Sequence, residues 1–599
     1  MNLLRPLPAF AEITILSFLS LGLVPLLPPD AAIARPEIFT DRAPPPDEEG
    51  GPRKSGMAVS DVQRALSEMG YYVGAIDGQL NRETRAAIRI YQKQVGLKID
   101  GKVTRPLWSA LQNTSKVQIL LRHLEQARKS GIEKARDALL ANPATRDLIK
   151  PAGPEKADPT RDASACFADP SVSCLLNAAL ANVKAVFKPE LRDWALGEIL
   201  AAQSRAGMNE AARQTAAQMQ DPRLIMVALR DIAEGQAESG NADGAWEAVN
   251  IIPDTTKMVE ALVAIATIQT RQRRFDDAEK TIFRLDRLLD QEKSHTRQVS
   301  LGSQVAILLA RAGKPTLSSS RLTRLETMAR ALSSDPDKEI SLRYVAAALA
   351  ETGHPDKAMV ILESISSASE RTSVLISTAA AQAQAGNTSA ALATAETIEA
   401  VRYRAVLLCK IAISQATGNE FEAAWQTLDR ARRSIEQISL PFARSYAISR
   451  ISLSISQLVV MAGNKRENSG EPGSQAGSLQ FSDAVKLAQS IDDARLRAHT
   501  LWSIGSDQRQ SGDADGASAT EQEAQLATVD IKSQLTQVWM YTELAILFAG
   551  RRDSDSSQRS FKSALDTASQ IDNAWGRARA LAKLAGTMLE MASIGAPPH

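Results

Sequence analysis

A turn of one type recurs along the C-terminal two thirds of this 599-residue chain. In each copy a glycine follows an Ala-rich stretch, polar residues come next, and another Ala follows a few positions later. The spacing is 33 residues from Gly207 to Gly240, 33 from Gly353 to Gly386, and 32 from Gly386 to Gly418. A period of this length indicates a repeat architecture. The turn glycines are Gly207, Gly240, Gly313, Gly353, Gly386, Gly418 and Gly512, and Arg273-Arg274-Phe275 fills the same slot without glycine.

Each turn has the chemistry of a helical hairpin. A glycine in the left-handed conformation ends one helix, and Asn or Asp caps the next. A small residue such as Ala278, Ala358 or Ala424 then lets the two helices approach closely. Stacked hairpins of about 33 to 40 residues form an α-solenoid, whose concave face typically docks another protein.

The array resembles tetratricopeptide-type repeats over roughly 400 residues. The glycine and the later alanine match that family, whereas its early Trp and Leu-Gly pair are mostly missing. We therefore expect a tetratricopeptide-like α-solenoid over residues 166–595, with a flexible insertion at 463–480 and a frayed tail from Ile594 to His599.

Composition agrees with an all-α fold. A chain of this length exceeds a single hydrophobic core. Aromatic residues are only 4% of the chain while Ala is abundant, which favours closely packed helices over β-structure. The formal net charge of +1 gives no argument for nucleic-acid binding.

A second organised stretch runs from Ser60 to Gln112 and predicts three short helices. The first starts with a Ser60–Gln63 capping box and stops at Gly70. The second spans 82–95 after a cap at Asn81, and the third runs through Leu111 after a cap at Thr104. We expect a core of Leu66, Ile76, Leu80, Ile88, Leu97, Val103, Trp108 and Leu111.

Two Ile-Asp-Gly turns separate these helices. Each begins with an isoleucine, Ile76 or Ile99, and ends in Leu or Val, so we expect each turn to be anchored in the core at both ends. Asp and Gly at such positions are typical of tight turns. The turn residues are Asp77, Gly78, Asp100 and Gly101.

Residues 58–112 resemble the peptidoglycan-binding-like domain of bacterial envelope proteins. Two positions depart from that pattern: Asn81 replaces a usual Gly, and Leu107 replaces a common Thr. The resemblance implies a three-helix fold and a cell-wall glycopeptide ligand, although copies of this domain also serve as plain protein contacts. The matching residues are Val62, Leu66, Gly70, Tyr71, Asp77, Gly78, Thr84, Ala87, Tyr91, Gln92, Gly96, Leu97, Asp100, Gly101, Trp108 and Leu111.

A glycan site on this domain would use exposed aromatic rings and planar hydrogen-bond donors, which suit sugars and carboxylated peptides. The candidates are Tyr71, Tyr72, Arg82, Arg85 and Gln92. For the turn residues Asp77, Gly78, Asp100 and Gly101 we expect a role in turn geometry alone.

Residues 1–34 read as an export signal, with Arg5 before an apolar run and Ala32-Ile33-Ala34 as a cleavage site. An uncleaved anchor is the alternative. Residues 35–57 are Pro-rich and acidic, which is typical of a disordered linker. The expected location is the periplasm, with no membrane span in the mature chain.

Between the domain and the array, residues 113–165 are expected to form a helix, 117–141, followed by a linker from 149. Cys166 and Cys174 then bracket a short loop and are expected to form a disulfide in an oxidising compartment. Cys409 lies in an apolar segment and is expected to be buried.

No catalytic or metal-binding motif occurs in the sequence. The five histidines do not share ligand spacing with each other or with cysteine. Phosphate-binding and nucleophile-elbow motifs are missing too. We therefore expect no enzyme activity, no metal and no cofactor; an unrecognised hydrolase would need a cleft that the sequence does not indicate.

Two hypotheses follow. The first is an exported, non-catalytic scaffold that holds peptidoglycan through its N-terminal domain and an envelope protein on its solenoid. The second is an adaptor or regulator of a cell-wall enzyme, in which the small domain contacts protein and not glycan.

Overall fold

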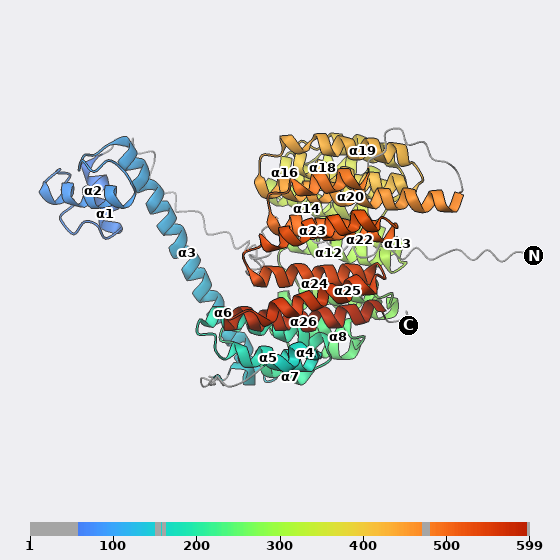
Figure 1. Cartoon of the computed structure of the whole chain (residues 1–599). Coiled ribbons are helices and arrows are strands. Elements are labelled where there is room, and N and C mark those ends of the chain that lie inside the picture. The colour runs from blue at the N-terminus through green and yellow to red at the C-terminus, as the bar shows by residue number, and fades with distance from the viewer. Residues whose placement is uncertain (1–57, 150–156, 158–162, 470–479, 596–599) are drawn as a thin grey trace, which may run out of the picture. The chain divides into compact units, whose positions relative to one another are not determined.

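The computed structural model describes residues 58–149, 157, 163–469 and 480–595 (Figure 1). All regular elements within these ranges are helices. Chain contacts divide the chain after Asp137 into two compact units, an N-terminal unit and a helical array. The expected signal at 1–34, the linker at 35–57 and the tail beyond Gly595 lie outside the described residues.

The N-terminal unit contains α1 (Val59–Glu68), α2 (Arg82–Gln94) and the start of α3 (Arg105–Ala141). The predicted capping box is wrong. Helix α1 begins at Val59 after Ala58, with no side-chain cap, and Gln63 is buried beneath the first Ile-Asp-Gly turn. The third short helix and the helix predicted at 117–141 are one continuous helix, because no breaker separates Leu111 from Val117.

The core of this unit has different members from the predicted one, and Leu97, which was expected in it, is half-buried outside the cluster. Ile76 and Ile99 are 45% and 54% exposed, so the turns are not anchored by their isoleucines. Leu107, which departs from the family pattern, is fully buried, and its amide donates to the Thr104 hydroxyl at 3.3 Å. The buried cluster consists of Val62, Leu66, Tyr72, Ala87, Ile88, Tyr91, Leu107 and Leu111, with Leu80, Val103 and Trp108 packed against it.

In the array, even-numbered helices of 17 residues or more alternate with odd-numbered helices of 8 to 16 residues, in the order that hairpin stacking predicts. The even-numbered helices from α6 onward contact one another in chain order. They are α6 (Pro189–Arg205), α8 (Pro222–Glu238), α10 (Thr255–Arg271), α12 (His295–Arg311), α14 (Asp335–Glu351), α16 (Ala368–Gln384), α18 (Val401–Thr417), α20 (Pro441–Ser469), α22 (Ala494–Gln510), α24 (Gln534–Gly550) and α26 (Ala574–Gly595).

Each odd-numbered helix packs against the even-numbered helix that precedes it. These helices are α7 (Asn209–Ala216), α9 (Ala242–Asn250), α11 (Phe275–Leu289), α13 (Pro315–Arg330), α15 (Pro355–Leu362), α17 (Thr388–Glu396), α19 (Phe421–Arg433), α21 (Phe481–Gln489), α23 (Ala514–Val529) and α25 (Ser554–Ser569).

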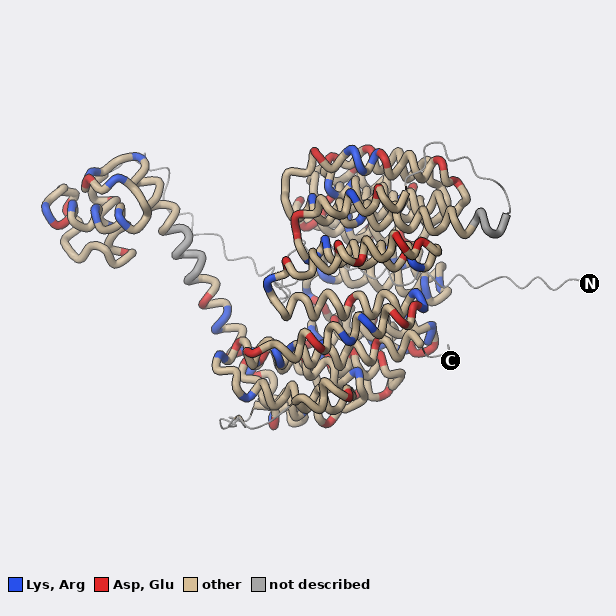
Figure 2. Tube along the Cα trace, in the orientation of Figure 1, with Lys and Arg blue, Asp and Glu red and all other residues tan. Residues whose placement is uncertain are grey.

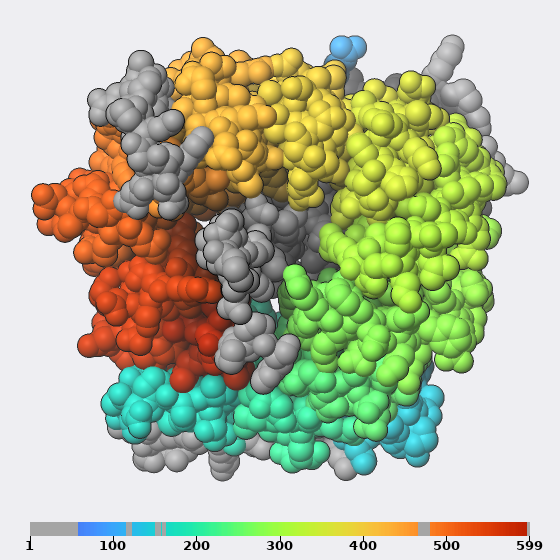
Figure 3. All heavy atoms as spheres, turned by 90° about the vertical axis from the view of Figure 1, so that its right-hand side faces the viewer, coloured from blue at the N-terminus to red at the C-terminus, as the bar shows by residue number. Residues whose placement is uncertain are grey.

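The last helix closes the array on itself. Helix α26 packs against α6, as the even-numbered helices do with their neighbours, and against α5 (Val172–Val183), which fills the place of its short partner. Figure 3 shows the colours running around a ring until the red C-terminal helices lie beside the cyan start of the array. The repeat pattern predicts the hairpins but not this closure.

A cluster of aromatic and charged side chains joins the two ends. The Arg579 side chain is 6% exposed and forms a bidentate ion pair with Glu198, with N–O distances of 2.7 to 3.0 Å. Its guanidinium lies 4.2 Å from the ring centre of Trp194, 4.6 Å from that of Trp575 and 4.9 Å from that of Trp539. Guanidinium stacking on indoles is a favourable geometry for a charge removed from water. We call these five residues the seam cluster.

The hairpin turns use left-handed residues at one fixed position. Gly207 has φ +72° and Gly386 has φ +79°, and the amide of the following residue donates to a carbonyl in the last helical turn. The prediction of Gly418 as a left-handed turn residue is wrong. Gly418 has a φ of −76°, and the next residue, Asn419, takes the left-handed conformation with a φ of +66°. Arg273, in the slot without glycine, has φ +59°.

A buried polar contact repeats inside the hairpins and was not predicted. A Thr hydroxyl on the short helix donates to a Gln amide oxygen twelve positions earlier on the long helix. The distances are 2.7 to 2.8 Å for Thr215–Gln203, Thr281–Gln269, Thr394–Gln382 and Thr427–Gln415.

The disulfide between Cys166 and Cys174 is present. It joins α4 (Ser164–Ala168) to the first turn of α5, with 5.6 Å between the Cα atoms. Cys409 is buried, which raises the pKa of its thiol to about 11. The predicted insertion begins later than expected, because α20 continues to Ser469; residues 470–479 lie outside the described part.

Helix α20 has the length and hydropathy of a membrane-spanning helix between Pro441 and Asn464. Half of its most apolar window is buried, and the helix contacts α18, α19, α21 and α22. A core helix of a folded domain passes the same test, and the packing of α20 is that of a core helix.

Candidate functional site

The first Ile-Asp-Gly turn is held by one buried amide. Gln63 Nε2 donates to Asp77 Oδ1 at 2.8 Å, and the Gly78 amide donates to Gln63 Oε1 at 2.8 Å. Asp77 Oδ1 also accepts from the Gln79 amide at 2.9 Å. The Gln63 side chain thus pairs with both the carboxylate and the backbone of the turn.

The second turn repeats this arrangement with Gln92. Gln92 Nε2 donates to Asp100 Oδ1 at 2.9 Å, and the Gly101 amide donates to Gln92 Oε1 at 2.9 Å. The Lys102 amide completes the turn at 3.0 Å from Asp100 Oδ1. Gly78 and Gly101 have φ of +73° and +66°, which only glycine adopts without strain.

These contacts set the charge of both turns. The hydrogen bond from Gln63 is the main reason that the pKa of Asp77 lies below its ordinary value, and Gln92 acts in the same way on the pKa of Asp100. Both carboxylates are therefore ionised at neutral pH and accept hydrogen bonds from their own turns. The carboxylates and glycines of both turns thus take part in turn geometry, the role that the sequence predicts for Asp77, Gly78, Asp100 and Gly101.

Two of the five glycan candidates do not have the exposure expected of them. Tyr72 is 4% exposed, and its hydroxyl donates to the Ala75 carbonyl at 2.8 Å. Gln92 is 2% exposed and uses its amide on the second turn. Side chains buried in this way support the surface from below and do not offer free donors to a ligand.

Tyr71 is half-buried. Its ring meets Tyr91 edge-on at a centroid distance of 5.4 Å, and its hydroxyl donates to Gln94 Oε1 at 2.6 Å. Part of the ring therefore remains accessible beside α2, with the hydroxyl already oriented.

Arg82 and Arg85 occupy the first turn of α2, after the Asn81 cap. The first Ile-Asp-Gly turn reaches this helix through Thr84, whose hydroxyl donates to the Gln79 carbonyl at 3.2 Å. The second turn reaches it at Gly101, where an added Cβ would lie 3.2 Å from the Arg85 carbonyl oxygen. The first turn therefore meets the start of α2, and the second runs along α2 from Arg85 to Gln92. We call Arg82, Arg85 and the two flanking turns the α2 surface.

The α2 surface carries available donors. Arg82 is exposed and Arg85 is half-buried, and within the described residues neither pairs with a carboxylate. A guanidinium offers a planar fork of N–H groups that fits a carboxylate bidentately. The surface can therefore bind an anionic group.

The N-terminal unit also exposes aliphatic side chains, which the sequence does not predict. Val73 is almost fully exposed, and Ile76, Ile90 and Ile99 are each about half exposed. Ile76 and Ile99 take the same position in the two turns. The sequence predicts Ile76 as a core residue and both isoleucines as anchors of their turns, because no local signal distinguishes an outward-facing isoleucine in a turn from a buried one.

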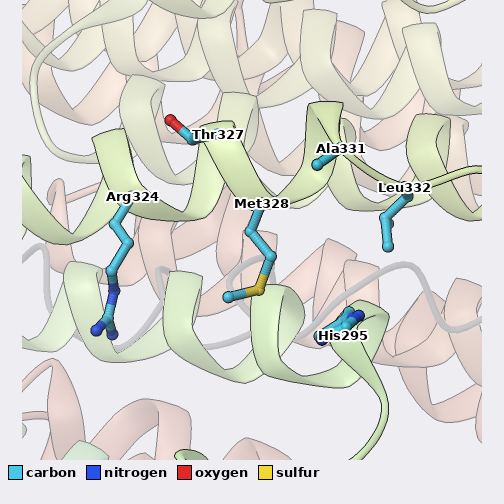
Figure 4. A pocket seen from close by; sticks show the side chains of 6 residues that line it. All are labelled: His295, Arg324, Thr327, Met328, Ala331 and Leu332. Carbon is cyan, nitrogen blue, oxygen red and sulfur yellow. The ribbon is translucent and has the colours of Figure 1, made fainter.

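On the array, an open hollow of about 540 Å³ lies between the start of α12 and the end of α13 (Figure 4). His295 comes from α12, and the other lining residues come from α13 and the two positions just beyond it. The hollow is wide open to solvent, so it offers little enclosure to a small molecule. Its lining residues are His295, Arg324, Thr327, Met328, Ala331 and Leu332.

The array carries charges of both signs on its helices (Figure 2). Burial is the main reason that the pKa of His499 lies at about 4 and that of Lys410 at about 8, and the positive charge of Arg450 acts in the same direction on both. His499 is therefore neutral at pH 7. Across the described residues, no group of three His, Cys, Asp or Glu side chains is arranged to hold a metal ion.

Comparison with known proteins identifies the N-terminal unit. Residues 55–111 match the family described as "Putative peptidoglycan binding domain". A search of curated protein sequences gave no match.

Solved structures resemble the chain only weakly. One is Ton1535 from Thermococcus onnurineus NA1, 16% identical, with 55% of this chain and 97% of that chain covered and a TM-score of 0.26. Another is described as a circular tandem repeat protein with novel repeat topology and enhanced subunit contact surfaces. It is 12% identical, with 89% of this chain and 98% of that chain covered and a TM-score of 0.16.

Proposed function

We propose that this protein is an exported, non-catalytic component of the bacterial cell envelope that binds peptidoglycan through residues 58–112 and a protein partner through its helical repeats. The family match of residues 55–111 is the observation that supports glycan binding. The proposed location is the periplasm, supported by the N-terminal apolar segment and by the disulfide between Cys166 and Cys174.

The proposed contact surface is the α2 surface together with Tyr71. Arg82 and Arg85 would pair with carboxylates of the wall peptides, and the accessible part of the Tyr71 ring would pack on sugar or peptide. Tyr72 and Gln92 would act indirectly, by holding the turns in place.

The test is co-sedimentation of the full chain with isolated sacculi. We expect the wild-type chain to pellet and the double variant Arg82→Ala/Arg85→Ala to stay largely in solution. A charge-matched control, Arg64→Ala/Arg105→Ala, removes two exposed arginines outside the α2 surface and should pellet like wild type. Equal pelleting of all three proteins would contradict the proposed surface, and no pelleting of the wild type would contradict wall binding.

A second function is favoured by the exposed aliphatic residues. Ile76, Ile99 and Val73 suit a protein contact better than a polar glycan, so the small unit would act as an adaptor to a cell-wall enzyme. In that case Ile76→Ser/Ile99→Ser would lose binding to the enzyme, and Arg82→Ala/Arg85→Ala would not.

The non-catalytic role has its own test. Purified chain incubated with peptidoglycan should release no soluble muropeptides. Release of muropeptides by the chain purified to homogeneity would contradict the non-catalytic role and indicate a hydrolase.

A further inference from the structure

The closing hairpin of the array is built from both ends of its sequence. Helix α5 comes first and α26 last, and they pack together as the long and short helices of every other hairpin do. The closure is therefore the one junction of the ring across which the chain itself does not run.

The disulfide lies at this junction. Cys166 is on α4, which contacts α25, and Cys174 is in the first turn of α5, which contacts α26. The two sulfur atoms thus belong to two helices, α4 and α5, which pack against α25 and α26 respectively. Only α4 and α5 carry cysteines at the junction, and the third cysteine, Cys409, is buried in α18.

Cys166 and Cys174 both lie on the N-terminal side of the junction, so all the contacts that cross it are non-covalent. They include the Arg579–Glu198 ion pair and the edge-on contact of Trp194 with Trp575, whose ring centres are 5.4 Å apart. Helix α4 is a helix of only five residues, so without a covalent tie it has little to keep it folded against α25.

We infer that the Cys166–Cys174 pair is a thiol–disulfide exchange site that controls how firmly the ring is closed. In the oxidised form the disulfide fixes α4 to α5, and α4 and α5 together hold α25 and α26. In the reduced form α4 separates from α25, and the α5–α26 contact opens more often.

The reductant in this thiol–disulfide exchange is a protein dithiol, which supplies the two electrons that reduce the Cys166–Cys174 bond. Cys174 is partly exposed and Cys166 is buried, so a thiolate of the dithiol attacks the Cys174 sulfur. A mixed disulfide forms on Cys174, and Cys166 leaves as a thiolate that takes up a proton. The second thiol of the dithiol then attacks the mixed disulfide, which releases Cys174 as a thiol and leaves the reductant as a disulfide.

Hydrogen–deuterium exchange of the full chain, with and without a dithiol reductant, tests the inference. On reduction we expect exchange to rise at least severalfold in peptides from α4, α5 and α26. Peptides from α14 and α16, on the far part of the array in sequence, should not change. The double variant Cys166→Ser/Cys174→Ser should match the reduced protein and should not respond to the reductant.

Three results would overturn the inference. One is unchanged exchange of α5 and α26 after complete reduction, verified by mass. Another is a disulfide that resists a protein dithiol such as reduced thioredoxin in the folded chain. The third is an equal increase in α14 and α16, which would indicate general loosening. Because the wild-type protein is first folded in its oxidised form and then reduced, the test does not depend on how the serine variant folds.

Discussion

Arg579 and Glu198 are separated by 381 positions in the chain, and their side chains form a bidentate ion pair at 2.7 to 3.0 Å. The pair joins the last helix to the first long helix of the array. Arg579 is also enclosed by three tryptophan rings, which remove it from water. The charge of Glu198 therefore compensates a guanidinium that has little other solvation.

Replacing Glu198 by Gln should destabilise the array by about 3–5 kcal/mol, because removal of one partner leaves a buried charge uncompensated. Chemical denaturation of the full chain, followed by far-ultraviolet circular dichroism, measures the loss. Glu521→Gln is the matched control, since Glu521 pairs with the exposed Arg509. It should cost less than about 1 kcal/mol. Equal losses of unfolding free energy in the two variants would contradict the argument that the buried pair contributes more than an exposed one.

Gln63→Ala should loosen the first Ile-Asp-Gly turn. The substitution leaves the Gly78 amide and the Asp77 carboxylate without their shared partner, and we expect a cost of about 1–3 kcal/mol. Hydrogen exchange of the amides from Gly78 to Leu80 should accelerate. Gln94→Ala, on the exposed face of α2, is the control and should leave this turn unchanged.

The left-handed turn positions predict opposite effects of two substitutions. Gly386→Ala should destabilise the array by about 1 kcal/mol, because an alanine is strained at a φ of +79°. No atom lies within 4 Å of the added Cβ, so a steric clash adds nothing to this cost. Arg273→Gly should stabilise it by a similar or smaller amount, because Arg273 has φ +59°. Thermal unfolding of the two variants checks the signs. Two shifts in the same direction would contradict the shared backbone role.

His499 predicts a loss of stability in mild acid. Its pKa in the folded protein is about 4, whereas an unfolded His titrates near 6.5, so protonation favours the unfolded chain. The stability is fully present above about pH 6.5 and declines as the pH falls toward 4, by roughly 2 kcal/mol at pH 5. His499→Gln should flatten this dependence between pH 7.5 and 5. An unchanged slope in the variant would assign the loss to other groups.

Local signals predicted most of the fold. The glycine turns gave the helix ends, because a left-handed residue after an apolar stretch is a local requirement of the hairpin. The disulfide partners lie only eight positions apart, so that pairing too was within reach of the sequence.

Long-range features were not predictable in the same way. Gln63 resembles a capping residue locally, and its role beneath Asp77 depends on how the chain returns fourteen positions later. Ring closure depends on the small rotation between successive hairpins, which accumulates over the array and is not encoded at any one turn. The seam cluster, which combines residues from α6, α24 and α26, is visible only once the ring has closed.

The closing hairpin also affects how the protein can be made. A ribosome produces α5 early and its partner α26 last, so the buried apolar side chains of α5, which include Leu175, Leu176 and Val183, lack during synthesis the part of their native cover that α26 supplies. Any nascent chain cut short before α26 keeps that surface exposed, which favours aggregation. A premature stop codon near the C-terminus should therefore lower the amount of the whole protein in the cell, and not merely shorten it.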